Sequence, residues 1–192
     1  EFMYDSDEKI GYIRLTAFSR NSARDLRRTM EELQATGLRG LVFDLRFNPG
    51  GLLSSAVEVS DMFISNGVIV STEGRNTQKK EWKAHQAGTF QGFPMAVLIN
   101  GFSASASEIL VGALQDHKRA VGGGNTTFCK GSVGSFRMLS NGGGITITTS
   151  RFITPSGRII EGEGLDPNFL VTSRDSKQAD IDQLEKAIEI LN

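Results

Sequence analysis

The sequence predicts a mixed α/β fold built as a single domain. Short apolar segments with strand-like patterns alternate with segments in which apolar residues recur every three or four positions. The predicted strands end at glycine-rich turns, and 192 residues are enough for one domain with a full hydrophobic core. Strand–helix alternation of this kind is typical of α/β and mixed architectures.

The first predicted strand covers 9–16, where side chains alternate between two faces. A helix follows from Ser22, whose spacing to Asp25 indicates a capping box, and it stops at Gly37. The face of this helix that we expect to pack into the core is apolar and carries Ala23, Leu26, Met30 and Leu33.

The middle of the chain repeats this order. A short buried strand is predicted at 38–44, and the sequence Asn-Pro-Gly-Gly at 48–51 ends it. A second amphipathic helix precedes a strand at 67–71, and its inward residues are Ala56, Val59, Met62 and Phe63. The segment 75–91 is polar and weakly patterned, so we predict a loop excursion there.

The remaining predicted elements are a buried strand at 95–100, a helix at 103–116, a hairpin and a last helix at 178–191. The hairpin is glycine-rich. Its arms, 131–139 and 144–149, flank a turn that contains consecutive glycines.

Charge and composition exclude several function classes. The chain has 21 basic and 22 acidic residues and a net charge of −1, so it lacks the basic balance of a nucleic-acid or membrane-surface protein. A single cysteine, Cys129, excludes an internal disulfide framework, and two histidines argue against a His-rich zinc site. We therefore expect no metal, no cofactor and no nucleic-acid partner.

Candidate catalytic residues lie in two turns, 44–51 and 100–108, that follow buried strands. Sites in open α/β sheets gather at the carboxyl ends of strands. The second turn holds serines at alternate positions: Ser103, Ser105 and Ser107. A nucleophile at a helix N-terminus gains from unpaired N–H groups and the positive end of the dipole. The alternative is that Ser103 or Ser105 is only the helix N-cap.

A serine nucleophile needs a base, and lysine is the residue type that remains. His117 lies on the same predicted helix as Ser105, roughly 18 Å away at ~1.5 Å per residue, and His85 falls in the polar excursion. A lysine accepts a proton near neutral pH only when it is buried away from carboxylates. Lys130 is the candidate, because small or apolar residues flank it.

Several motifs in series resemble the carboxyl-terminal processing, or tail-specific, proteases. In order they read DLRxNPGG, VLIN with SASASEI and QDxxRA, TFxKGxV, TPSGR and GLDP. The resemblance extends from Lys9 to Leu191, and the separation of Ser105 and Lys130 also fits the family.

This resemblance implies a Ser–Lys endopeptidase on a ClpP/crotonase-like core. Ser105 would attack the scissile carbonyl, and neutral Lys130 would accept its proton and return it to the leaving amine. Backbone N–H groups of Gly51 and Ala106 would hold the oxyanion. The implied substrates are unfolded or tagged polypeptides with exposed C-termini, and the implied location is periplasmic, secreted or lumenal.

Four further residues are implied as supporting the site: Glu108, Asp116, Arg46 and Asn48. Glu108 is one helical turn from Ser105 and can support the hydrogen bonds of the site. Asp116 lies about 16 Å along the helix at ~1.5 Å per residue, too far for contact. We expect Arg46 and Asn48 to brace the oxyanion turn, with the arginine paired to a carboxylate that the sequence does not identify.

Two positions depart from the family pattern and keep an alternative open. Gly134 stands where many members carry a glutamine, and Cys129 stands where a glycine usually precedes the lysine. Gly134 favours a catalytically degenerate binding or scaffold module on the same fold. A crotonase-type acyl-CoA enzyme is disfavoured, because the SASAS motif belongs to the proteases. Cys129 as nucleophile is disfavoured too, since an inert thiol is commoner.

The resemblance also sets the expected domain organisation. Residues 1–8 are expected to be a cloning remnant and lead-in, and 9–192 to be the catalytic core. Family members normally carry a PDZ domain and an amino-terminal helical region ahead of this core, and we recognise neither here. The sequence leaves the oligomeric state open.

Overall fold

A computed structural model describes residues 2–4, 8–75, 77–171 and 176–192. In the larger sheet the strand order is β1-β2-β3-β6-β7-β10, with β1 antiparallel and the others parallel. These strands are β1 Phe2–Tyr4, β2 Ile10–Arg14, β3 Gly40–Asp44, β6 Met95–Ile99, β7 Val121–Gly124 and β10 Phe169–Leu170. The smaller sheet is antiparallel with the order β5-β4-β9-β8, formed by β4 Val68–Gly74, β5 Thr77–Lys83, β8 Ser132–Met138 and β9 Gly144–Ile153.

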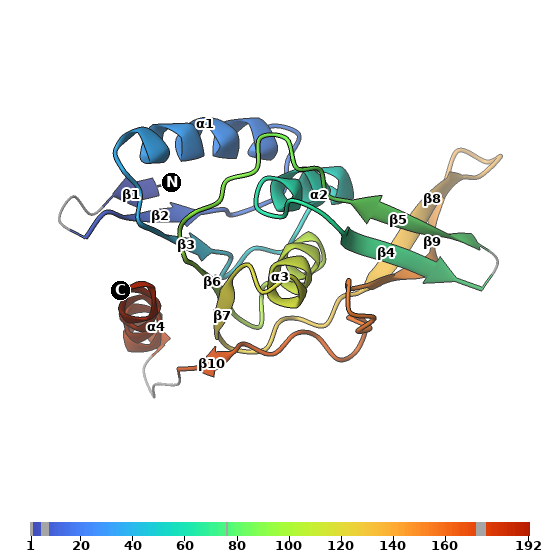
Figure 1. Ribbon diagram of the computed structural model, residues 1–192. Helices are drawn as coiled ribbons and strands as arrows, with labels where there is room; N and C mark the ends of the chain where they lie inside the picture. The colour runs from blue at the N-terminus through green and yellow to red at the C-terminus, as the bar shows by residue number, and fades with distance from the viewer. Residues whose placement is uncertain (1, 5–7, 76, 172–175) are drawn as a thin grey trace.

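Helices cover both faces of the larger sheet (Figure 1). They are α1 Ser22–Ala35, α2 Leu53–Asp61, α3 Ala106–Asp116 and α4 Ser176–Leu191. The main core lies between α1, α2, α3 and one face of the sheet, where Phe43 is fully buried. The other face, which carries Val42, packs against Ala187 of α4. Neighbouring residues of β3 thus serve two cores, because successive side chains of a strand point to opposite faces.

The structure confirms the mixed α/β class. The predicted strands and helices that flank the two candidate turns are present within a few residues of their expected bounds, and β8 and β9 form the predicted hairpin. The more specific likeness to ClpP and crotonases is not tested by these observations and stays a prediction. Part of the expected lead-in forms β1, which pairs with β2.

Two local predictions are wrong. The segment 75–91 contains β5, which pairs along β4, although its side chains are mostly exposed and show no apolar period. Pairing with a neighbouring strand, rather than its own pattern, makes this segment a strand. Ser22 is not an N-cap: α1 is preceded by Asn21, and the Ser22 hydroxyl instead donates to the carbonyl of Ala17 at 3.1 Å.

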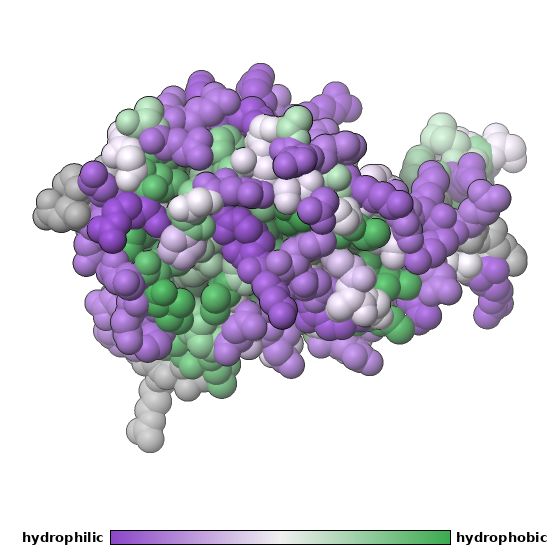
Figure 2. Space-filling model, in the orientation of Figure 1, coloured by the Kyte–Doolittle hydropathy of each residue, from purple (hydrophilic) through white to green (hydrophobic). Residues whose placement is uncertain are grey.

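On the face shown in Figure 2, polar side chains predominate and apolar side chains gather in patches between them. The hairpin of β8 and β9 projects beyond the rest of the molecule (Figure 1). Its exposed apolar side chains are Phe136, Met138, Leu139, Ile145 and Ile147. Of the helices in the described residues, none combines the length and the apolar character needed to cross a bilayer.

Candidate active site

The two candidate turns lie side by side, because β3 and β6 are parallel neighbours and both end at the same sheet edge. Hydrogen bonds join the turns directly. The Ala104 N–H and the Ser107 hydroxyl both donate to the Asn48 carbonyl at 3.0 Å, and the Phe47 N–H donates to Asn100 Oδ1 at 3.0 Å. The structure therefore places the predicted oxyanion turn against the predicted serine turn.

The three serines have different environments. Ser103 and Ser107 are fully buried, and their hydroxyls donate to the carbonyls of Leu45 and Asn48. Ser105 is partly exposed and occupies the N-cap position of α3 at φ 55° and ψ −108°. This conformation is uncommon for a residue with a side chain, and such strain clusters at functional sites. Of the three serines, Ser105 is the one placed to meet a substrate.

The helix begins at Ala106, three residues later than the predicted start. The residues from Ser103 to Ser105 form a turn that precedes the helix, in which the Ser103 hydroxyl accepts the Asn100 N–H at 2.9 Å. This turn places Ser105 at the N-terminus of α3, where the helix dipole favours developing negative charge.

Glu108 is completely buried and accepts four hydrogen bonds. Its Oε2 accepts the backbone N–H groups of Ser105 at 2.7 Å and Lys130 at 2.9 Å. Its Oε1 accepts the Thr127 hydroxyl at 2.6 Å and the Cys129 N–H at 2.8 Å. One carboxylate therefore fixes the backbones of both predicted dyad residues.

Lys130 differs from the expectation, because its side chain is exposed rather than buried. In the described part of the chain no hydrogen bond joins its ammonium group to Ser105. The side chain lies at the rim of an open site, in contact with solvent. Gly134, which stands where many members of the resembled family carry a glutamine, lies on β8 and is also exposed.

An apolar pocket of about 460 Å³ adjoins Lys130 and the serine turn. Three of its lining residues are aromatic and exposed, and two of these, Phe47 and Phe102, stack with ring centroids 5.6 Å apart. The remaining lining residues are Pro49, Ala104 and Phe128. Sequence reasoning missed these aromatic residues. The signal was a phenylalanine in each of three turns that also carry site residues.

The predicted oxyanion donors are available. Among the described residues, the N–H groups of Gly51 and Ala106 have no hydrogen-bond acceptor. Gly51 is exposed, and Gly50 beside it packs so closely that an added Cβ would lie 2.9 Å from the Ala106 nitrogen. The oxyanion turn therefore lies directly against the start of α3.

Asn48 and Arg46 hold this turn. Asn48 is fully buried, accepts the Gly50 N–H at 2.9 Å and donates to the Leu15 carbonyl at 2.7 Å. The carboxylate that pairs with Arg46 is Asp44, at 2.6 Å. Tyr12 donates to the same carboxylate at 2.7 Å, and burial together with this bond raises the pKa of Tyr12 to about 12. The tyrosine is therefore a permanent donor at neutral pH.

Asp116 lies away from the site, at the C-terminal end of α3. Its carboxylate accepts the Ser156 N–H at 2.9 Å and pairs with Arg158 at 2.5 Å. Burial acts to raise the pKa of Asp116, but hydrogen bonds from Thr154 and Ser156 and the Arg158 charge outweigh it and lower the pKa. Asp116 therefore anchors the 154–158 turn rather than contacting Ser105.

Replacing Asp116 with asparagine is expected to lower the free energy of unfolding at neutral pH by about 1 to 2 kcal/mol. Bonds to a charged group are stronger than neutral ones, but solvent screens the part-exposed Arg158. Because the folded pKa is depressed, this stability is present above the ordinary carboxyl value and is lost as pH falls through the folded pKa. Urea unfolding of wild type and variant from neutral pH to about pH 3 measures this difference in the free energy of unfolding. A difference that persists in acid would contradict the role assigned to the Asp116 carboxylate.

Cys129 does not have the features of a nucleophile. Burial raises the pKa of its thiol, and the charges of Glu108 and Asp166 raise it further. A thiol of raised pKa stays protonated and weakly reactive at neutral pH. Its backbone adopts φ 73°, which explains why glycine suits this position.

Comparison with known proteins then identifies the family. The sequence pattern of peptidase family S41 matches residues 9–171, which is most of the chain. The chain belongs to peptidase family S41.

Relatives of this S41 chain include two bacterial proteases. A carboxy-terminal-processing protease of Bartonella bacilliformis is 43% identical over 173 residues, which cover 88% of this chain and 40% of the relative. A carboxyl-terminal-processing protease of Synechocystis is 38% identical, covering 85% of this chain and 38% of the relative. The S41 chain therefore spans about two fifths of the length of these relatives.

A solved structure agrees with this assignment. The photosystem II D1 C-terminal processing protease matches 95% of this S41 chain and 46% of its own chain, with a TM-score of 0.77 at 33% identity. The resemblance to carboxyl-terminal processing proteases is thereby confirmed. These likenesses do not test the roles of Ser105 and Lys130, which stay predictions.

Proposed function

We propose that this protein is a serine endopeptidase in which Ser105 is the nucleophile and Lys130 the general base. The supporting observation is the shared contact at Glu108: one carboxylate oxygen accepts the backbone N–H groups of both residues. A nucleophile and its base need fixed positions relative to each other. Glu108 supplies that constraint from inside the protein.

In the proposed acylation step, Ser105 Oγ attacks the scissile carbonyl carbon while the neutral Lys130 amine takes its proton. The C–O π electrons move to oxygen, and the N–H groups of Gly51 and Ala106 hold the oxyanion. Collapse of the intermediate breaks the C–N bond, and Lys130 returns the proton to the leaving amine. Water then attacks the acyl-enzyme by the same route, releases the carboxylate product and restores Ser105.

The exposed state of Lys130 fits a substrate-dependent base. A polypeptide bound across the site covers the rim where Lys130 lies and removes water from it. Desolvation favours the neutral amine, which is the form that accepts a proton.

The apolar pocket gives the proposed substrate class a physical basis. Phe47, Phe102 and Phe128 offer aromatic surface that suits an apolar side chain of an extended substrate. Folded proteins bury such side chains, so unfolded or tagged polypeptides are the proposed substrates, cleaved near their C-termini as in the relatives named for that processing. We also propose a periplasmic, secreted or lumenal location, on the family resemblance.

The deciding experiment is cleavage of casein by the full-length protein, its Ser105→Ala variant and its Ser107→Ala variant. We expect cleavage by the wild type, none by Ser105→Ala, and cleavage by Ser107→Ala, which loses one buried hydrogen bond but keeps the nucleophile. Cleavage by Ser105→Ala at the wild-type rate would overturn the proposal.

The second candidate function is a degenerate binding module. Three observations favour it. Within the described residues no hydrogen bond joins the Lys130 ammonium to Ser105, and Gly134 replaces the glutamine that is common in the family. An apolar pocket, which suits an apolar ligand, adjoins the site. In this case neither wild type nor variants would cleave casein, and a fluorescent apolar ligand would bind in a titration. Phe102→Ala would weaken that binding.

A further inference from the structure

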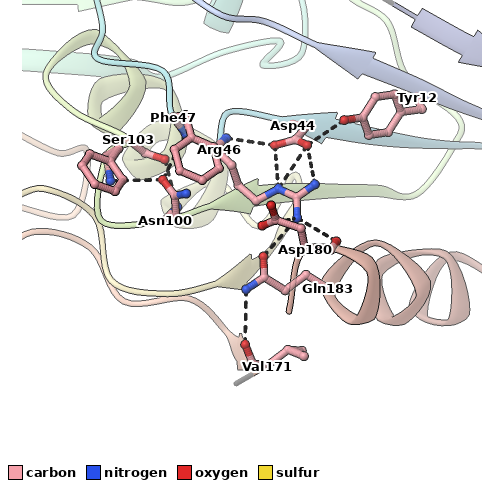
Figure 3. A network of polar contacts seen from close by, with 10 residues as sticks. Tyr12, Asp44, Arg46, Phe47, Asn100, Ser103, Val171, Asp180 and Gln183 are labelled. Atoms are coloured by element: carbon pink, nitrogen blue, oxygen red, sulfur yellow. Dashed lines mark hydrogen bonds and ion pairs between the residues drawn. The ribbon is translucent and has the colours of Figure 1, made fainter. Parts of the chain in front are cut away.

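The guanidinium of Arg46 connects the end of β3 to helix α4 (Figure 3). The side chain is 8% exposed. Its Nε and Nη2 bond the Asp44 carboxylate, at 3.0 and 2.6 Å. Its Nη1 points the other way and donates to α4, to the Asp180 carbonyl at 2.8 Å, to Asp180 Oδ1 at 3.2 Å and to Gln183 Oε1 at 3.2 Å. Arg46 therefore holds two elements far apart in sequence in one fixed relation.

Arg46 also lies in the oxyanion turn (44–51), at the start of its 46–51 segment. Its own N–H donates to Asp44 Oδ1 at 2.9 Å, so both backbone and side chain are fixed by the same carboxylate. The next residue, Phe47, has φ 61°, a conformation that tertiary contacts must impose. The turn then reaches Gly50, which packs against Ser105 and Ala106. The 46–51 segment thus links Arg46 to the proposed oxyanion donors through a short stretch of backbone.

Helix α4 also docks through apolar packing that does not involve Arg46. Its apolar face packs on the sheet through Ala187, Leu184, Ile188 and Leu191. Buried ionic contacts add little net stability compared with apolar packing, because removing charges from water is costly. The polar contact instead defines the position of Arg46 relative to α4. Gln183, which accepts a hydrogen bond from Arg46, is 2% exposed, and its own side-chain amide donates to the Val171 carbonyl at 3.2 Å.

We propose that Gln183 and Asp180 are positioning residues, through which α4 fixes Arg46 and hence the oxyanion turn. The inference rests on the proposed serine peptidase function for its kinetic consequence. The structural part of the inference, that the docking of α4 fixes the conformation of the 46–51 segment, does not depend on that function. Activity then depends on how α4 is docked, although α4 contributes no atom to the reaction.

The test uses three variants of the full chain. Gln183→Leu removes both contacts of the side chain, whereas Gln183→Glu keeps an oxygen acceptor for Arg46, loses the donor to Val171 and adds a negative charge beside the guanidinium. Ile188→Ala is the matched control, because it weakens the apolar packing of α4 without touching Arg46. Each is assayed for kcat and KM on a peptide, at a temperature where melting curves show all proteins folded.

We expect Gln183→Leu to lower kcat roughly 10-fold at unchanged KM, since small misplacement of a positioned group can cost up to about 100-fold. Gln183→Glu should recover most of this, and Ile188→Ala should lower Tm while leaving kcat unchanged. Equal kcat losses in Gln183→Leu and Ile188→Ala, or none in Gln183→Leu, would overturn the proposal.

Hydrogen exchange separates this inference from the proposed function. Amides of the 46–51 turn should exchange faster in Gln183→Leu than in Ile188→Ala, whether or not the protein cleaves peptides. If casein is cleaved equally by wild type and Ser105→Ala, the peptidase proposal fails, and the exchange data alone decide the positioning role. Unchanged exchange in Gln183→Leu would reject that role even in an active enzyme.

Discussion

Replacing Glu108 with alanine is expected to abolish casein cleavage and to lower the free energy of unfolding by about 3 kcal/mol or more. The substitution leaves four donors without their acceptor, including the N–H groups of Ser105 and Lys130. A donor left unpaired inside a protein costs about 1 to 3 kcal/mol. The turn before α3 and the 127–130 segment would then separate, and the proposed nucleophile and base with them. Urea unfolding and casein cleavage measure the two effects.

Glu108→Gln gives a sharper comparison than alanine. A carboxamide has one acceptor oxygen, so it can keep either the Ser105 and Lys130 bonds or the Thr127 and Cys129 bonds, but not both sets. We expect a folded protein with a large loss of kcat. Glu161→Ala is the matched control, since within the described residues this exposed carboxylate has one hydrogen-bond donor, the Gly131 N–H, where Glu108 has four. A Glu108→Ala variant with wild-type stability and cleavage would contradict the role of Glu108.

The sequence could predict the site's components because each is a local feature. A turn after a buried strand, glycines within it and alternate serines before a helix are all visible within a few residues. What it could not predict is which distant groups meet. Glu108 is near Ser105 in sequence, but its contacts to Thr127, Cys129 and Lys130 come from the fold. The buried state expected for Lys130 failed for the same reason: exposure depends on the packing around it.

Arg46 shows this limit most clearly. Its need for a carboxylate was predictable from its charge, and one partner is only two residues away, at Asp44. The other partners, Asp180 and Gln183, belong to a helix at the far end of the chain. The strand β5 was missed in a similar way, since a polar segment becomes a strand only through pairing with β4.

Replacing Gly50 with alanine is expected to reduce kcat/KM by about 100- to 1000-fold, the usual cost of losing an oxyanion donor. Gly50 has φ 97°, where a side chain is strained, and an added Cβ would lie 2.5 Å from the Ala104 carbonyl oxygen and 2.9 Å from the Ala106 nitrogen. These are backbone atoms, so no side-chain rotation can relieve the overlap. The turn must move away from α3 and take the Gly51 N–H with it.

Gly142→Ala is the control for backbone strain, because it adds a strained residue without displacing the oxyanion turn. Gly142 has φ 83° and nothing within 4 Å of an added Cβ, so alanine there meets strain without a clash. We expect it to lower Tm slightly and to leave kcat/KM unchanged, while Gly50→Ala lowers both. If Gly50→Ala cleaved as fast as Gly142→Ala, the oxyanion would not be held where the oxyanion turn meets Ala106. A selective loss in Gly50→Ala places the reacting carbonyl at the junction of that turn with α3, because only there do the added methyl group and the proposed donors compete for the same space.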